Sequence, residues 1–144
     1  MESIKLNSGI IRLEIDCDGK KNIIAFNPED VSFAEGVYRL MADMEEKQAE
    51  FKNKEAEIAK TAKFDDNGIP DNFGERLALY KDVCDYMRAK IDELFGEGTS
   101  QKVFGDANTL NMFEQFFDGI APYIRKAREN KLESYRANIK NVME

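Results

Sequence analysis

Histidine is absent from this sequence of 144 residues. Without an imidazole, the chain cannot build Ser–His or Cys–His catalysis, a histidine-ligated zinc site or the usual proton shuttle of neutral pH. Its two cysteines, Cys17 and Cys84, cannot complete a structural zinc site alone. The sequence therefore predicts no metal and no other cofactor. Cys17 falls at a turn, where we expect it to be exposed, and Cys84 falls on an apolar helical stripe, where we expect it in the core.

Long apolar runs are also missing. None approaches the roughly 20 residues that a membrane-spanning helix needs. The first residues lack the charged-then-apolar layout of a signal peptide. We therefore expect no membrane contact and a location in the cytoplasm, in a compartment where both cysteines stay reduced.

Basic residues are outnumbered, with 21 Lys and Arg against 28 Asp and Glu, for a net charge of -7. A nucleic-acid binder would need a basic face, so we expect no nucleic-acid partner. The excess of acidic groups favours solubility and a basic protein partner, with mimicry of phosphate as an alternative. The basic residues gather from residue 120 onward, where the net charge is +3, leaving -10 for the rest. Opposed charge blocks suggest internal docking or contact with a partner.

What is present is typical of a mainly helical single domain over residues 1–144, with 42% apolar and 34% charged residues. Asp18-Gly19 stands between two β-prone runs and predicts a β-hairpin within residues 1–26. A lone hairpin is marginal in water. We therefore expect it to lie on helices or to pair with the edge of another chain.

Helix signals divide the remainder into a bundle of three to four helices, so the predicted fold class is mainly α, of the α+β type. Asn27-Pro28 predicts the start of a long charged helix. Gly96 and Gly105 predict helix ends, Thr99 predicts a cap, and Pro122 predicts a kink in the last helix. The predicted helices span residues 27–62, 73–95, 99–104 and 107–143. We expect the helix of residues 73–95 to be the core helix, because it carries a regular apolar stripe. The stripe consists of Leu77, Tyr80, Cys84, Met87, Ile91 and Leu94.

Three patterns suggest chemistry and have simpler explanations. The acidic run that begins at Asp65 fails the calcium-loop pattern, which needs an oxygen ligand at Ile69 and a glycine at Pro70. We expect instead an Asn-Gly turn followed by a helix cap at residue 71 or 72. The glycines of residues 96–100 lack the lysine and the preceding strand of a phosphate loop. The phenylalanines of residues 104–117 are placed to stack bases or, at helical spacing, to fill a core, which is the commoner role.

Residues 91–105, Ile-Asp-Glu-Leu-Phe-Gly-Glu-Gly-Thr-Ser-Gln-Lys-Val-Phe-Gly, followed by Asn108, resemble a segment of small proteins from Firmicute phages and prophages. Those proteins share the hairpin, the charged helices and this Phe-Gly-x-Gly-Thr joint. They lie among tail-morphogenesis genes and look like tail assembly chaperones, which keep a tape-measure or tail-tube protein soluble. The resemblance implies a non-enzymatic protein of virion assembly with a protein partner. A homo-oligomer is a further possibility, and the alternatives are a structural or connector protein of the virion and an inhibitor or regulator of a host protein.

A tape-measure protein is a long helix, so the resemblance implies a helix-in-groove contact. Two regions are the candidate partner-binding surfaces. One is a face of the long charged helix, and the other is the basic C-terminal segment. Their residues are Met41, Met44, Gln48 and Phe51, and Arg125, Arg128, Lys131 and Arg136.

Overall fold

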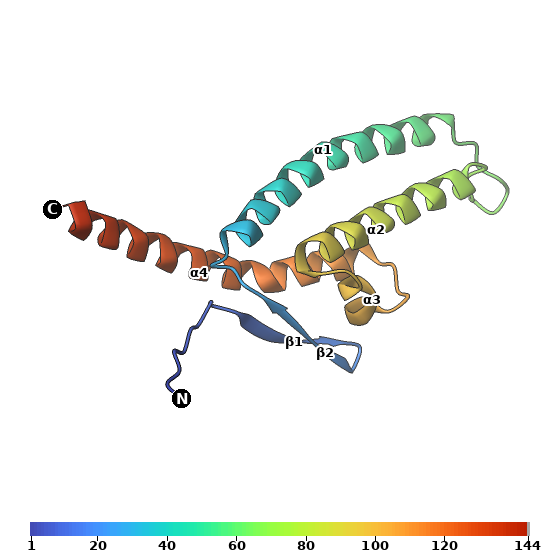
Figure 1. Cartoon of the computed structure of the whole chain (residues 1–144). Coiled ribbons are helices and arrows are strands. Elements are labelled where there is room, and N and C mark those ends of the chain that lie inside the picture. Colours follow the sequence, from blue (N-terminus) through green and yellow to red (C-terminus); the bar gives the residue numbers. More distant parts are fainter. Residues whose placement is uncertain (144) are drawn as a thin grey trace. The chain divides into compact units, whose positions relative to one another are not determined.

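The computed structural model describes the backbone of residues 1–143 and the side chains of residues 1–126 and of Glu129. Figure 1 shows an antiparallel β-hairpin followed by four helices, which confirms the predicted α+β fold class. The elements are β1 (Ile11–Cys17), β2 (Lys20–Phe26), α1 (Val31–Thr61), α2 (Phe73–Phe95), α3 (Thr99–Phe104) and α4 (Leu110–Met143).

The hairpin closes on the Asp-Gly turn that the sequence predicts. Asp18 and Gly19 have φ values of 54° and 87°, and two positive φ angles define the type I′ turn that matches the twist of a hairpin. The Asp16 carboxylate accepts a hydrogen bond from the Gly19 N–H at 2.9 Å. In the register that follows, Leu13 lies opposite Ile24.

One face of the hairpin is apolar and turned inward. Ile24 and Phe26 are buried, and Phe26 stacks on Phe33 with ring centroids 5.6 Å apart. Cys17 Sγ lies 3.8 Å from Met112 Sδ, so the hairpin contacts α4. This contact agrees with the expectation that the hairpin lies on helices. Cys17 is half-buried by this contact, and the expectation of an exposed thiol was wrong.

The long helix α1 begins four residues later than the sequence predicted. The Asn27 carbonyl accepts the Asp30 N–H at 3.1 Å and closes a turn around Pro28. Asp30 then provides the cap, because its carboxylate accepts the Ser32 N–H at 2.9 Å. Asn27-Pro28 and Asp30 both favour the start of a helix, and α1 begins after Asp30.

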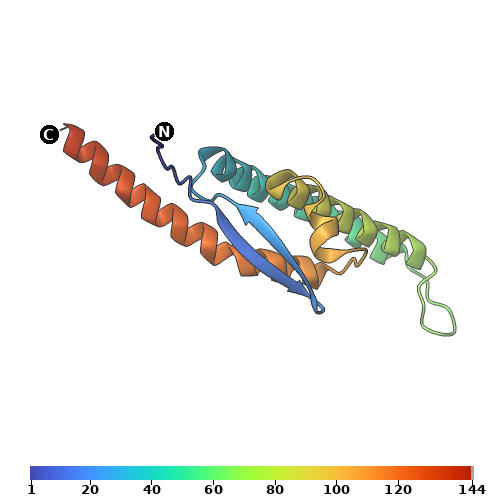
Figure 2. The same cartoon turned by 60° about the horizontal axis from the view of Figure 1, so that its bottom comes forward.

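The helices α1 and α2 lie side by side in Figures 1 and 2, joined by a loop with its own hydrogen bonds. The Asp65 carboxylate accepts the N–H groups of Asn67 and Ile69, both at 2.9 Å, which explains the acidic run as turn chemistry. Asn72 is the N-cap residue of α2, but its side chain makes no capping bond. It donates instead to the Ile58 carbonyl at 2.6 Å and so links α2 to the end of α1.

The apolar stripe of α2 is buried only along part of its length. Cys84 and Ile91 are buried, as predicted, and Leu79 is buried beside them. Leu77 and Tyr80 were predicted to be core residues, and both are exposed. Helical spacing identifies the apolar face correctly, but it does not tell how far along the helix that face is covered.

The joint between α2 and α3 depends on glycines and on one carboxylate. Gly96 ends α2, as predicted, with φ 116° and ψ 145°, a combination that is almost confined to glycine. Gly98, not Thr99, is the N-cap of α3. Asp92, in the last turn of α2, accepts the Ser100 N–H at 2.7 Å and satisfies a free N–H group of α3.

The last helix, α4, starts at Leu110, three residues after the predicted start. The Arg88 guanidinium accounts for the delay, because it donates to Asn108 Oδ1 and to the Gly105 carbonyl, both at 2.8 Å, and also to the Ala107 carbonyl. These bonds hold the residues before α4 outside the helix. Pro122 lies inside one continuous helix, and the predicted kink stays a prediction.

The chain forms two compact units, one of residues 1–36 with α4 and one of residues 37–109. The prediction of a single domain over residues 1–144 is not tested by this division. Each unit holds its own set of buried apolar side chains, and Phe113, Phe116 and Ile120 of α4 are among them, as the core interpretation of the aromatic residues requires. The sets are Ile24, Phe26, Phe113, Phe116 and Ile120 in the first unit, and Leu40, Leu79, Cys84, Ile91, Val103 and Phe104 in the second.

Candidate functional site

The predicted partner-binding face of α1 is divided between solvent and the neighbouring helix. Met41 and Gln48 are exposed, whereas Met44 is half-buried. Phe51 is also half-buried, and its ring meets the Tyr86 ring of α2 edge to face, with centroids 6.3 Å apart. The structure therefore does not bring these four residues together on one free surface. Phe51 serves instead to hold α1 and α2 together.

The predicted basic surface on α4 is described only at its start. Arg125 is exposed. The side chains of Arg128, Lys131 and Arg136 lie outside the described residues, so the second candidate surface stays a prediction.

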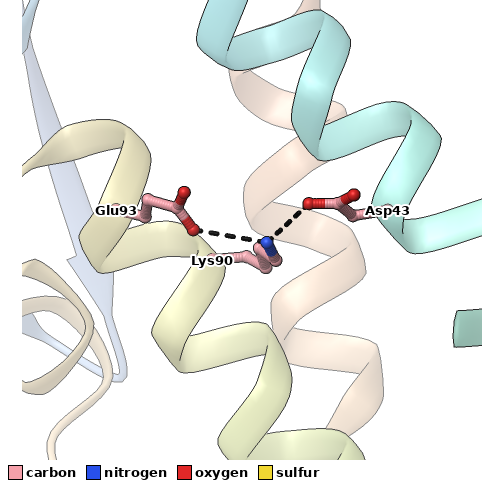
Figure 3. A network of polar contacts seen from close by, with 3 residues as sticks. All are labelled: Asp43, Lys90 and Glu93. Atoms are coloured by element: carbon pink, nitrogen blue, oxygen red, sulfur yellow. Dashed lines mark hydrogen bonds and ion pairs between the residues drawn. The ribbon is translucent and has the colours of Figure 1, made fainter.

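Lys90 of α2 forms an ion pair with Asp43 of α1, and Figure 3 shows the lysine between its two carboxylate partners. Its ammonium lies 2.7 Å from Asp43 Oδ2 and 3.3 Å from Glu93 Oε2. It also lies 5.5 Å from the centre of the Tyr86 ring. The hydrogen bond to Asp43 raises the pKa of Lys90, against the opposing effect of burial. A lysine held in its charged form is no base, so this network fixes the helix pair and gives no sign of catalysis.

The other perturbed groups have structural explanations of the same kind. Hydrogen bonds from Lys47 and Lys54 lower the pKa of Glu50, which pairs with both on the surface of α1 at 3.2 Å. Glu50 and Lys54 stand four residues apart, the spacing at which opposite charges meet on one face of a helix. Burial raises the pKa of Cys84 and of Tyr86, which makes an ionised, reactive thiol at Cys84 unfavourable.

Neither a metal site nor a membrane-spanning helix is evident in the residues that the structure describes. Within them, no three side chains of the types that ligate metals come together in a suitable group. None of the helices, over the same residues, combines the length and the apolar character needed to cross a bilayer.

The most distinctive surface feature lies elsewhere, at the end of the α1–α2 pair where the loop joins the two helices. Five large apolar side chains are 39% to 70% exposed there, and we call them the tip patch. Three of them stand on one face of α2 at spacings of four and three residues, and two stand in the loop. They are Phe73, Leu77 and Tyr80, and Phe64 and Ile69.

The loop is held in place around the tip patch. Phe64 forms an isolated β-bridge with Pro70, and the Asp65 N–H donates to the Ile69 carbonyl at 2.9 Å. Asp71 and Lys63 exchange two further bonds, from the Asp71 N–H to the Lys63 carbonyl at 2.7 Å and from the Lys63 N–H to the Asp71 carboxylate at 2.9 Å. The loop residues of the patch therefore have a defined place beside the start of α2. Sequence reasoning missed this surface because it assigned the whole stripe of α2 to the core.

One comparison with known proteins gives a match. The model of a family of unknown function, DUF6673, matches residues 20–141, from the first residue of β2 almost to the end of α4. The chain belongs to the DUF6673 family. No curated protein and no solved structure matches it. The matched region contains β2, the first three helices, the tip patch and α4 up to residue 141, whereas β1 and the residues before it precede it.

Proposed function

We propose that this protein is a non-enzymatic tail assembly chaperone that binds a tape-measure or tail-tube protein and keeps it soluble. The proposal rests on two supports of different kinds. One is the resemblance of residues 91–105 to phage tail-morphogenesis proteins. The other is the tip patch, which is the observation that carries a binding role.

Five exposed large apolar side chains at one end of a helix pair are costly for a soluble monomer unless another molecule covers them. Burying a Leu or Phe side chain contributes about 1.5–3 kcal/mol, and exposed apolar groupings commonly mark interaction sites. Phe73, Leu77 and Tyr80 form a narrow strip along α2. A strip of this shape suits the apolar side of a long helix, which is the form expected of a tape-measure protein.

The charge of the chain fits the same role. A chaperone of this kind must keep the bound complex dissolved, and a net charge of -7 opposes the association of one complex with another. The ion pairs described above need no substrate to explain them. Shielding of a partner requires only an apolar contact surface and a charged exterior, and both are present.

The direct test is co-expression with the tape-measure protein of the same phage or prophage genome. We expect the wild-type chain to raise the soluble fraction of that protein and to elute with it. Leu77→Asp in the tip patch should abolish both effects, because the charge would have to be buried in the contact. Ala78→Asp adds the same charge at an exposed position beside the strip and should behave as wild type. Equal effects of the two variants would contradict the proposed surface.

A second measurement separates a chaperone from a component of the particle. Mass spectrometry of purified virions should detect the tail-tube and tape-measure proteins but not this chain. Its presence at a stoichiometry like theirs would instead identify a structural or connector protein.

A further inference from the structure

We propose that residues 2–7 form an exchange arm that adds as a third strand to the open edge of β1 in a second copy of this chain. The proposal is independent of the tail-chaperone function. It rests on three features of the first unit: the way the arm is anchored, the outer edge of β1, and the match between the side chains of the arm and those of β1.

The arm is fixed at its base and exposed beyond it. Asn27 Nδ2 donates to the Ser8 carbonyl at 2.8 Å, and the Gly9 N–H donates to the Asn7 side chain at 3.0 Å. Gly9 has φ 98°, and a methyl group there would collide with the Glu29 carboxylate. Further out, Ile4 and Leu6 are 89% and 91% exposed. Two fully hydrated apolar side chains at a spacing of two residues are typical of a strand that lacks its sheet.

The hairpin has an edge for such a strand. Within the described residues the sheet has only two strands, so no further strand lies along the outer edge of β1. Cys17 and Lys20 flank the two-residue turn and form a hydrogen-bonded pair, which turns the backbone groups of every second residue of β1 inward. The backbone groups of Arg12, Glu14 and Asp16 therefore point to the outer edge. Edges of this kind are templates for strand addition.

One antiparallel register satisfies both faces of the combined sheet. With Lys5 opposite Glu14, Leu6 stands beside Leu13 and Ile4 beside Ile15, on the face where the β1 side chains are half-buried. Lys5 then meets Glu14 on the outer face, where both are exposed, and opposite charges on neighbouring strands attract. All of residues 2–7 find a partner between Arg12 and Cys17.

The neighbouring registers fit less well. A shift of one residue would place Ile4 and Leu6 on the outer, charged face of the sheet. A shift of two residues in one direction sets Lys5 opposite Arg12, and in the other direction it carries the start of the arm past Cys17, where β1 ends. Charge and length therefore select the Lys5–Glu14 register. In a reciprocal exchange each copy gives one arm and receives one, and the assembly closes as a dimer, which is the form that we propose.

The first test is the association state of the full chain by sedimentation equilibrium, with far-UV circular dichroism to confirm folding. We expect a dimer whose dissociation constant rises at least about 100-fold in Leu6→Asp, which buries a charge beside Leu13. Ala78→Asp introduces a carboxylate at an exposed position of the other unit, outside the tip patch, and should leave the dimer intact. A monomeric wild-type chain, or a dimer unaffected by Leu6→Asp, would overturn the proposal.

The register has its own test in a charge exchange. Lys5→Glu and Glu14→Lys should each raise the dissociation constant by about fivefold, since exposed pairs contribute little. The double variant should return to the wild-type value, because the pair is restored with its signs reversed. Oxidation of a mixture of Lys5→Cys and Glu14→Cys chains should give a disulfide between the two positions, detected by peptide mapping, because opposed residues of a hydrogen-bonded pair lie about 5.5 Å apart. Additive losses in the double variant, with no such disulfide, would refute this register.

Discussion

At the scale of single residues, backbone conformation separates the glycines that the fold requires from those that it tolerates. Gly96 has φ 116° and ψ 145°, whereas Gly74, in the first turn of α2, has helical neighbours and open space around its Cα. We expect Gly96→Ala to lower the free energy of unfolding by about 1–3 kcal/mol, because an alanine is strained there. Gly74→Ala should raise it by about 0.5–1 kcal/mol through helix propensity. Urea unfolding of both variants measures the contrast, and equal effects would contradict the assigned conformation of Gly96.

Cys84 links stability to pH at the same scale. Burial of the thiol, followed by the nearby Asp85 carboxylate, raises its pKa above the ordinary value of 9.0. The folded chain therefore holds the thiol proton more tightly than the unfolded chain. The resulting stabilisation is fully present below pH 9 and is lost as the pH rises through the raised pKa of the folded state.

We accordingly expect the free energy of unfolding of the wild-type chain to fall above about pH 9, and to fall less steeply in Cys84→Ala. Lys90 and Tyr86 also have raised pKa values and add to the decline in both proteins, so the difference between the two slopes isolates the thiol. Urea unfolding at intervals from pH 7 to pH 10.5 provides the measurement. Parallel curves would show that Cys84 ionises equally easily in both states.

At the scale of the elements, the sequence predicted which helices and strands exist better than where each begins. The bounds of α2 and α3 are as predicted, because glycines end both helices and no competing signal lies nearby. The start of α1 was misplaced because Asn27 and Asp30 are both good caps, and only the turn around Pro28 decides between them. The start of α4 was misplaced because Arg88 holds the preceding loop, and such a long-range contact leaves no local signal.

The side chain that caps α3 also gives no local sequence signal, because it comes from the preceding helix. Asp92 lies eight residues before Ser100 and still accepts its N–H at 2.7 Å, so the cap belongs to the preceding helix. We expect Asp92→Ala to cost about 1 kcal/mol of stability, as the loss of a helix cap usually does. Asp92→Asn keeps an acceptor oxygen and should cost only a few tenths of that. Equal losses in the two variants, measured in urea, would mean that the carboxylate charge matters more than the hydrogen bond.

At the scale of the whole molecule, the candidate site was the least predictable feature. The periodicity of α2 marks Leu77 and Tyr80 as apolar-face residues, but whether a face is covered depends on the lengths and ends of the other elements. Conversely, Phe51 was expected to face a partner and instead contacts Tyr86. A single sequence thus gives the faces of a helix and leaves open which of them the rest of the chain hides.

The tip patch and the net charge act against each other in solution, and their balance should depend on pH. The sequence has an isoelectric point near 4.8. Near that pH the mutual repulsion of the molecules vanishes, and exposed apolar side chains then promote association. We expect the wild-type chain to scatter light strongly near pH 4.8 and to clear again at pH 7, where the charge is -7.

Two variants of equal net charge separate the effect of the tip patch on association from the effect of the net charge. Leu77→Asp and Ala78→Asp each add one carboxylate to neighbouring positions of α2, so they shift the isoelectric point by the same amount. Leu77 belongs to the tip patch and Ala78 does not. Light scattering near the isoelectric point should therefore fall markedly in Leu77→Asp and stay close to wild type in Ala78→Asp. If both variants scatter alike, association is governed by net charge alone, and the patch is not the adhesive surface that a chaperone of this design requires.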